Sequence, residues 1–132
     1  MTDGGLDAIF FSIYVRQARE AQSPDAFTPW GYEHAYKLAV EKFDAVRRFT
    51  RDIAPDKIEL AVNAADVRRI NAQGKKVALM GVENGYPIGE EIARVKEFYD
   101  RGARYMSLTH NGHNQLADSH TGEREGWKRT GS

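Results

Sequence analysis

The sequence has no cysteine, no long apolar run and no excess of either charge. Without cysteine there is neither a disulfide framework nor a thiolate metal site, so any metal ion must use histidine and carboxylate ligands. No apolar run approaches the roughly 20 residues that cross a bilayer, so we expect no membrane segment in this chain. Lys plus Arg equals Asp plus Glu, at 19 each, which argues against nucleic acid or an anionic membrane as the main partner.

Short apolar runs alternate with longer amphipathic runs along the 132 residues. This pattern predicts strands near 7–15, 76–83 and 104–110, helices near 29–53, 64–73 and 88–101, and loop or disorder over 111–132. No repeat or low-complexity stretch divides the chain, so we treat 1–132 as one unit. The alternation is typical of an α/β fold in which right-handed crossovers join about three parallel strands.

The predicted helices have recognisable ends and apolar stripes. Thr28 and Pro29 suit the cap and the first turn of the first helix. Asn63, followed three residues later by Asp66, suits the cap of the second helix. The apolar stripe of the third helix is predicted to comprise Ile88, Ile92, Val95 and Tyr99.

Two ionisable residues close predicted strands. Glu83 ends the second strand and His110 ends the third, and the carboxyl ends of parallel strands are where such folds gather their chemistry. A carboxylate that ends a buried strand is costly unless it is paired or binds a metal. Glu83 is therefore a candidate metal ligand, although it could equally emerge into solvent or pair with an arginine. His110 is a candidate site residue because the strand would fix its direction.

Two further histidines follow His110 in the predicted loop. His113 and His120 would complete a group of three histidines within eleven residues, which suggests a metal cluster. Their spacing does not match a known zinc pattern, such as two histidines at i and i+4 on a helix. We therefore expect His113 and His120 to be solvated loop residues.

Three blocks of the sequence, in order, resemble one enzyme family. Residues 4–15 (GGLDAIFFSIYV) resemble the second barrel strand of the membrane (renal) dipeptidases, and residues 75–85 (KKVALMGVENG) resemble the third, with its Gly-[IV]-Glu-x-Gly motif. Residues 98–111 (FYDRGARYMSLTHN) resemble the fourth strand, and residues 114–119 (NQLADS) also fit. The blocks cover nearly the whole chain, so the resemblance is specific in a way that no single block would be.

The resemblance implies a fold and a chemistry. The family fold is a (β/α)8 TIM-type barrel, which typically takes about 250 residues, so we expect this chain to be an internal part of such a barrel. In the family, two zinc ions are bridged by a glutamate, which Glu83 matches, and a histidine that His110 matches contacts the substrate and the charged carbonyl oxygen. The implied reaction is hydrolysis of dipeptides, some with a D-residue at the second position, by a metal-bound hydroxide.

The resemblance also has gaps. The family's His-x-Asp motif, its two later histidine ligands and its catalytic aspartate have no counterpart in these residues, and Tyr86 stands where the family usually has histidine. A single ligand does not hold zinc, which takes about four, so we expect the isolated chain to bind no zinc and to be inactive. Open sheet edges would favour a homodimer or strand exchange. Two alternatives stay open: a stand-alone, non-catalytic α/β binding module, and another hydrolase of the amidohydrolase type.

Overall fold

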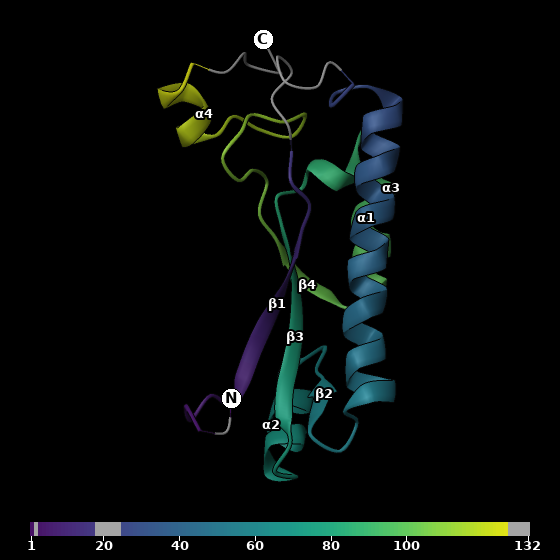
Figure 1. Ribbon diagram of the computed structural model, residues 1–132, viewed down its shortest axis with the longest axis vertical. Helices are drawn as coiled ribbons and strands as arrows, with labels where there is room; N and C mark the ends of the chain where they lie inside the picture. The colour runs from purple at the N-terminus through teal and green to yellow at the C-terminus, as the bar shows by residue number, and fades with distance from the viewer. Residues whose placement is uncertain (2, 18–24, 127–132) are drawn as a thin grey trace.

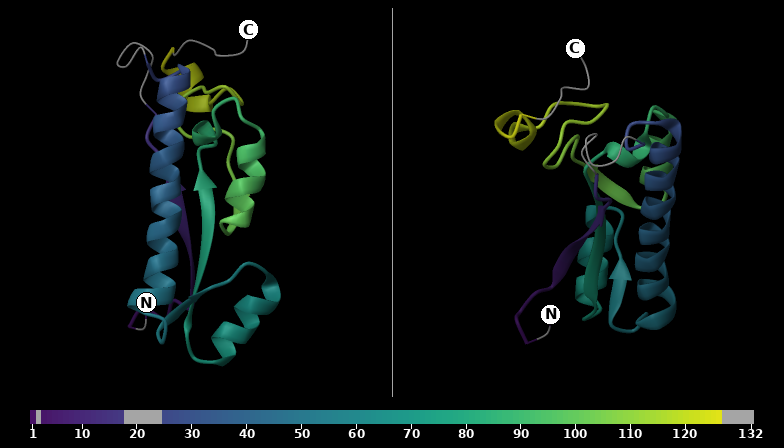
Figure 2. Two further views of the ribbon diagram at one scale, coloured as in Figure 1. Left: turned by 90° about the vertical axis from the view of Figure 1, so that its right-hand side faces the viewer. Right: turned by 45° about the horizontal axis from the view of Figure 1, so that its top comes forward.

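The computed structural model describes residues 1, 3–17 and 25–126, and within these residues four parallel strands form one sheet. The central strand, β3 (Lys76–Glu83), pairs with β1 (Ala8–Tyr14) from Val77 to Glu83. On its other side, β3 pairs first with β2 (Ile58–Leu60) and then with β4 (Ala103–Met106). Figures 1 and 2 show the two long strands running side by side, so that their carboxyl ends reach the same edge of the sheet.

The longest helix lies along one face of the sheet (Figure 1). It is α1 (Pro29–Arg48), and it continues through one π-helical stretch, η1 (Phe49–Ile53). The helix begins at Thr28, whose hydroxyl accepts a 3.3 Å hydrogen bond from the backbone N–H of Gly31 and so satisfies one of the unpaired donors of the first turn. None of the described helices is long and apolar enough to cross a membrane.

The main core lies between α1 and the sheet. It is built from alternate residues of the two long strands, which lie on one face because side chains alternate along a strand, and from the inward stripe of α1. Its fully buried members include Ile13 of β1, Met80 and Val82 of β3, Ala39 and Phe43 of α1, and Phe98. The other alternate residues of β1 and β3 therefore occupy the opposite face of the sheet, which α1 does not cover.

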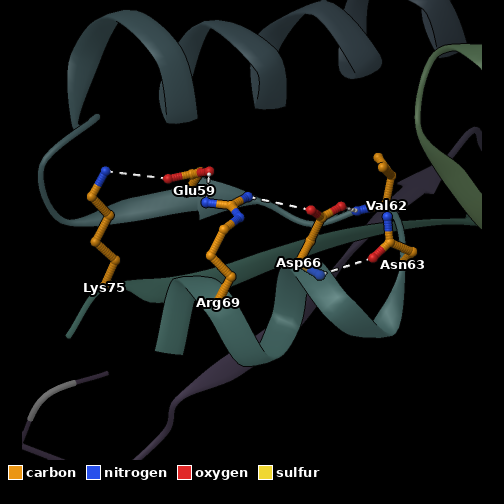
Figure 3. Close-up of polar contacts among 6 residues, drawn as sticks. All are labelled: Glu59, Val62, Asn63, Asp66, Arg69 and Lys75. Atoms are coloured by element: carbon orange, nitrogen blue, oxygen red, sulfur yellow. Dashed lines mark hydrogen bonds and ion pairs between the residues drawn. The ribbon is translucent and has the colours of Figure 1, made fainter. Parts of the chain in front are cut away.

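A second, smaller core lies at the amino-terminal end of β3. Ala61, Ile70 and Val77 pack together there, so α2 (Ala64–Ala72) covers the first residues of the face opposite to α1. Asn63 caps α2 by accepting a 2.8 Å hydrogen bond from the N–H of Asp66, as its sequence predicts. The Asp66 carboxylate in turn accepts a 3.1 Å bond from the N–H of Val62, one residue before the cap, in an arrangement that resembles a capping box (Figure 3).

An ion-pair network holds α2 against β2 (Figure 3). Glu59 of β2 accepts hydrogen bonds from Arg69 of α2 at 2.8 Å and from Lys75 at 3.2 Å, and Arg69 also contacts Asp66 at 3.3 Å. The guanidinium of Arg69, together with the ammonium of Lys75, holds the pKa of the Glu59 carboxyl below its ordinary value. The network therefore ties a short strand to the helix that follows it.

The structure corrects several predicted elements. The strand β2 was not predicted, because its three residues are too few to show a period. The strand predicted over 104–110 is shorter, since β4 ends at Met106. Residues 111–126 are not simply loop, because they include the short helix α4 (His120–Arg124). The remainder of the predicted loop, residues 127–132, lies outside the described residues.

The third helix begins later than predicted, and a different side of it is buried. Residues Tyr86–Ile88 form a separate 3-10 turn, η2, and α3 spans Ala93–Asp100. Between them Gly89 adopts a φ of 59°, which favours glycine and interrupts the helix. The core-facing residue of α3 is Phe98, whereas Ile92 of the predicted stripe is 77% exposed.

Candidate active site

Polar side chains gather at the carboxyl ends of β1 and β3, on the sheet face that α1 does not cover. The register places Tyr14 of β1 opposite Glu83 of β3, and Ser12 opposite Gly81. Ser12, Tyr14 and Glu83 therefore share one face, because residues two apart on a strand point the same way. In a barrel this face is the interior, and its carboxyl end is where catalytic residues lie.

The Glu83 carboxylate contacts two other side chains. The Ser12 hydroxyl donates a hydrogen bond to Oε2 at 2.7 Å, and Nδ1 of His110 lies 3.2 Å from Oε1. The side chains of Glu83 and His110 are 39% and 38% exposed, so both can still be reached from solvent. Each carboxylate oxygen thus has a defined direction, and the group is accessible to a ligand.

His110 reaches Glu83 from a loop, which corrects the prediction that a strand fixes its direction. β4 ends at Met106, four positions earlier. The histidine is held by other means: its ring packs edge-on against Tyr14 with centroids 5.1 Å apart, and its carbonyl accepts a 2.9 Å hydrogen bond from the Ser119 hydroxyl. The structure therefore brings together both predicted site residues, Glu83 and His110.

His113 is buried, so the prediction that it is a solvated loop residue is wrong. Its side chain is 1% exposed, and Nδ1 accepts a 2.9 Å hydrogen bond from the N–H of Ser119. Gly122 lies directly against the ring, since a Cβ there would be 3.0 Å from Nε2. The ring thus fixes the start of α4, a tertiary role that no spacing in the sequence signals. His120, in contrast, is exposed, as predicted, but it is the first residue of α4 and not a loop residue.

Tyr86, in the turn after Glu83, has a structural role. Its ring is buried against Tyr32 with centroids 5.6 Å apart, and its hydroxyl donates to the carbonyl of Ala26. Burial raises the pKa of the Tyr86 phenol to about 12, so the hydroxyl remains a donor at neutral pH. Tyr86 therefore anchors the turn to the segment that precedes α1.

Two buried asparagines, which the sequence did not identify as important, lie behind this site. Asn84 follows Glu83 and adopts a φ of 77°, a left-handed conformation that asparagine tolerates better than most residues. Its side-chain oxygen accepts a 2.8 Å hydrogen bond from the amide of Asn114. The Asn84-Gly85 pair is a turn signal in the sequence, but its partner 30 residues away is not visible there.

The donor set fits one part of a metal centre. A carboxylate such as Glu83 has two oxygens, each able to face a different cation, and its exposed position allows this. Zinc takes about four ligands. Among the described residues, no group of three or more His, Cys, Asp or Glu side chains could hold a metal ion. Glu83 therefore fits as a single ligand, and further ligands would have to come from outside the described residues.

Comparison with known proteins places the chain in one group. The sequence model of the family described as membrane dipeptidase (peptidase family M19) matches residues 1–131. A dipeptidase of Aspergillus oryzae, aclJ, is 33% identical over 122 residues, which are 91% of this chain and 28% of the fungal protein. The chain therefore spans less than a third of the length of this relative.

Two solved structures, of a probable dipeptidase and of a metallopeptidase, have a similar fold. A probable dipeptidase of Pseudomonas aeruginosa, PvdM, superposes with a TM-score of 0.73 at 23% identity, covering 86% of this chain and 28% of that protein. A metallopeptidase of Rhodobacter sphaeroides, solved with a phosphinate mimic of the dipeptide L-Ala-D-Ala, gives a TM-score of 0.69 at 20% identity, covering 95% and 44%. These likenesses establish the fold: four parallel strands and their helices, forming part of a TIM-type barrel.

Proposed function

Because this chain belongs to the membrane dipeptidase family, peptidase family M19, we propose that it is part of a zinc-dependent dipeptidase and carries two of the active-site residues. Glu83 would be the carboxylate ligand shared by two zinc ions, and His110 would contact the substrate. The observation that supports both roles most strongly is their meeting at 3.2 Å at the carboxyl end of β3. Parallel α/β barrels assemble their chemistry at this end.

Each residue has a role that follows from its geometry. Zinc would lower the pKa of water and polarise the scissile carbonyl. Glu83 would offer one carboxylate oxygen to each ion, and Ser12 would hold the group in that orientation through its hydroxyl. Nδ1 of His110 lies 3.2 Å from Glu83, and the opposite nitrogen, Nε2, would contact the substrate. A hydrogen-bond donor at a developing oxyanion contributes about 3 kcal/mol.

The remaining ligands belong to parts of the barrel beyond these 132 residues, so the isolated chain is inactive and retains no zinc. The proposed substrate is a dipeptide, including one with a D-residue at the second position. The related Rhodobacter metallopeptidase was solved with a mimic of such a dipeptide, which supports this choice. Another hydrolase of the amidohydrolase type would share the site, and a panel of dipeptides and lactams would separate the two.

We also propose that the isolated chain self-associates through its open sheet edges. Within the described residues, β1 and β4 each pair with β3 alone, which leaves one edge of each without a strand partner. On the sheet face that α1 does not cover, Phe10 of β1 and Tyr105 of β4 are 47% and 45% exposed, with ring centroids 5.2 Å apart. Unpaired edges favour pairing with another chain. Light scattering of the isolated chain should show a dimer or larger species, and a strict monomer at high concentration contradicts this.

The proposal is tested by replacing Glu83 in the full-length enzyme. Glu83→Gln keeps the size of the side chain but removes its charge and one of its acceptor oxygens, so bound zinc and dipeptide turnover should both fall by at least about tenfold. Glu41→Gln, on the exposed side of α1, is the matched control and should change neither. Unchanged zinc content and turnover in the Glu83 variant would overturn the proposed role.

A further inference from the structure

The side-chain amide of Asn114 is buried and makes four hydrogen bonds to other described residues. The residue is 1% exposed. Its Nδ2 donates to Oδ1 of Asn84 at 2.8 Å and to the carbonyl of Leu108 at 2.7 Å. Its Oδ1 accepts from the N–H of Leu116 at 2.8 Å and from that of Ala117 at 3.2 Å. An amide has two donors and two acceptor positions, and these partners engage all of them.

The orientation of the amide is determined by its partners. Nδ2 faces two oxygens that can only accept, and Oδ1 faces two backbone N–H groups that can only donate. Rotating the amide by 180° would place oxygen against oxygen and nitrogen against nitrogen on all four contacts. Asn114 therefore has one stable arrangement, and a buried amide of this kind specifies local geometry strongly because any unmet bond is costly.

The two donated bonds join the segments that carry Glu83 and His110. Asn84 directly follows Glu83, and Leu108 lies two residues before His110. Backbone contacts continue the connection: the N–H of Asn84 donates to the Ser107 hydroxyl at 2.9 Å, and the N–H of Gly85 donates to the Leu108 carbonyl at 3.2 Å. The Asn114 side chain contacts both segments at once, beyond the end of β4 at Met106.

The two bonds that Oδ1 of Asn114 accepts stabilise the loop after His110. By accepting from the N–H groups of Leu116 and Ala117, Oδ1 of Asn114 fixes a turn that leads to Ser119. The Ser119 hydroxyl donates to the carbonyl of His110 at 2.9 Å. The backbone of His110 is therefore held on both sides, by Asn114 through Leu108 and by Ser119.

We propose that Asn114 is a positioning residue that sets the separation of Glu83 and His110. It touches neither metal nor substrate and acts through Asn84 and Leu108. This inference rests on the proposed function of Glu83 and His110. Catalytic groups must be held within a fraction of an ångström for efficient reaction, and partners one shell further out are what hold them.

The test compares two amide-to-acid substitutions in the full-length enzyme. Asn114→Asp keeps the size and the accepting oxygen but removes both donors and points an oxygen at two acceptors. Gln115→Glu is the matched control, because it also removes two donated bonds, to the carbonyls of Tyr86 and Gly89, from a segment that carries neither Glu83 nor His110. Both variants add the same charge within one residue of each other.

In Asn114→Asp, kcat/KM for a dipeptide should fall by about 10- to 100-fold, mainly through kcat. Its crystal structure should show Nδ1 of His110 and Oε1 of Glu83 separated by more than hydrogen-bond distance, compared with 3.2 Å here. Gln115→Glu should keep that separation and most of the activity. An unchanged separation in Asn114→Asp, or equal losses in the two variants, overturns the proposal.

A milder variant covers the case in which Asn114→Asp does not fold. Asn84→Gly removes the acceptor of one Asn114 bond, together with the two longer contacts of the Asn84 amide, to the N–H of Tyr86 and the side chain of Gln17, both at 3.4 Å. Glycine adopts the φ of 77° without strain. It should lengthen the same separation and lower kcat by a smaller factor, and no change in either contradicts the proposal. The separation is a structural measurement, so it tests the positioning role even if Glu83→Gln shows that Glu83 does not bind zinc.

Discussion

The hydroxyl of Ser12 in β1 donates a 2.7 Å hydrogen bond to Oε2 of Glu83 in β3, a residue 71 positions later in the sequence. The contact exists because β1 and β3 pair in parallel register, with Ser12 opposite Gly81 and its side chain directed along the strand toward Glu83. A carboxylate held in this way loses less conformational freedom when it binds a cation. Loss of such partners of metal ligands typically lowers metal affinity or activity by about 10- to 100-fold.

Removing that hydroxyl should weaken metal binding. In the full-length enzyme, Ser12→Ala is expected to lower zinc affinity by about 10-fold, at the lower end of the usual range for such partners. Chelator competition measures the affinity directly. Ser12→Thr keeps a hydroxyl at the same position and should retain most of it. Equal affinity of the Ala and Thr variants for zinc would mean that the hydrogen bond has no part in holding Glu83.

Glu59 should make stability depend on pH in the acidic range. Its pKa is lowered by Arg69 and Lys75, so its contribution is fully present above the unfolded-state pKa of about 4.3 and is lost as pH falls through the lower folded-state value. The side chain is 31% exposed, so Glu59→Gln should cost only about 0.5–1 kcal/mol at pH 7. Urea unfolding at pH 7 and at pH 3 measures the difference. A deficit in the variant that is as large at pH 3 as at pH 7 contradicts this assignment.

Tyr86 should have the opposite dependence, at alkaline pH. Its folded pKa of about 12 exceeds the ordinary value of about 10, so the unfolded chain ionises first and stability falls as pH rises from about 10 toward 12. Tyr86→Phe removes this ionisation, and it also leaves the Ala26 carbonyl without its donor, at a cost of about 1–3 kcal/mol. The difference in unfolding free energy between wild type and variant should therefore be smaller at pH 10.5 than at pH 8. A gap that does not narrow with pH rules out this role for the phenol.

Two substitutions, one in α3 and one just before it, test which side of this segment meets the core. Phe98 is 2% exposed and packs against Phe43 with ring centroids 5.2 Å apart, so Phe98→Ala should cost about 3–5 kcal/mol. Ile92 precedes the helix and is 77% exposed, so Ile92→Ala should cost less than about 0.5 kcal/mol. Thermal unfolding of both variants decides the matter. A larger loss from Ile92 than from Phe98 would restore the stripe expected from sequence.

This helix shows where sequence patterns are sufficient and where they are not. The apolar runs that become β1 and β3 are continuous, and their sequence places Glu83 at a strand end as observed. In α3 the stripe was assigned wrongly because Gly89 interrupts the helix and shifts its start. A pattern of apolar residues gives a period, but the phase depends on where the chain turns, and that is decided by tertiary contacts.

In the site, too, some residues can be predicted from sequence patterns and others cannot. Glu83 was identified because a charged residue ending a buried run is unusual, and His110 because of its place after a second such run. Ser12, Asn114 and His113 carry no such signal. Their roles depend on partners 71, 30 and 6 residues away, and polar residues with long-range partners look like ordinary loop or strand residues in one sequence.

The central claim is that Glu83 bridges two zinc ions, and a crystal structure of the full-length enzyme with data collected across the zinc absorption edge tests it most directly. The account predicts two anomalous peaks, each about 2.0–2.2 Å from a different carboxylate oxygen of Glu83. Zinc peaks coordinated by other residues, with Glu83 still bound only to Ser12 and His110, would contradict it.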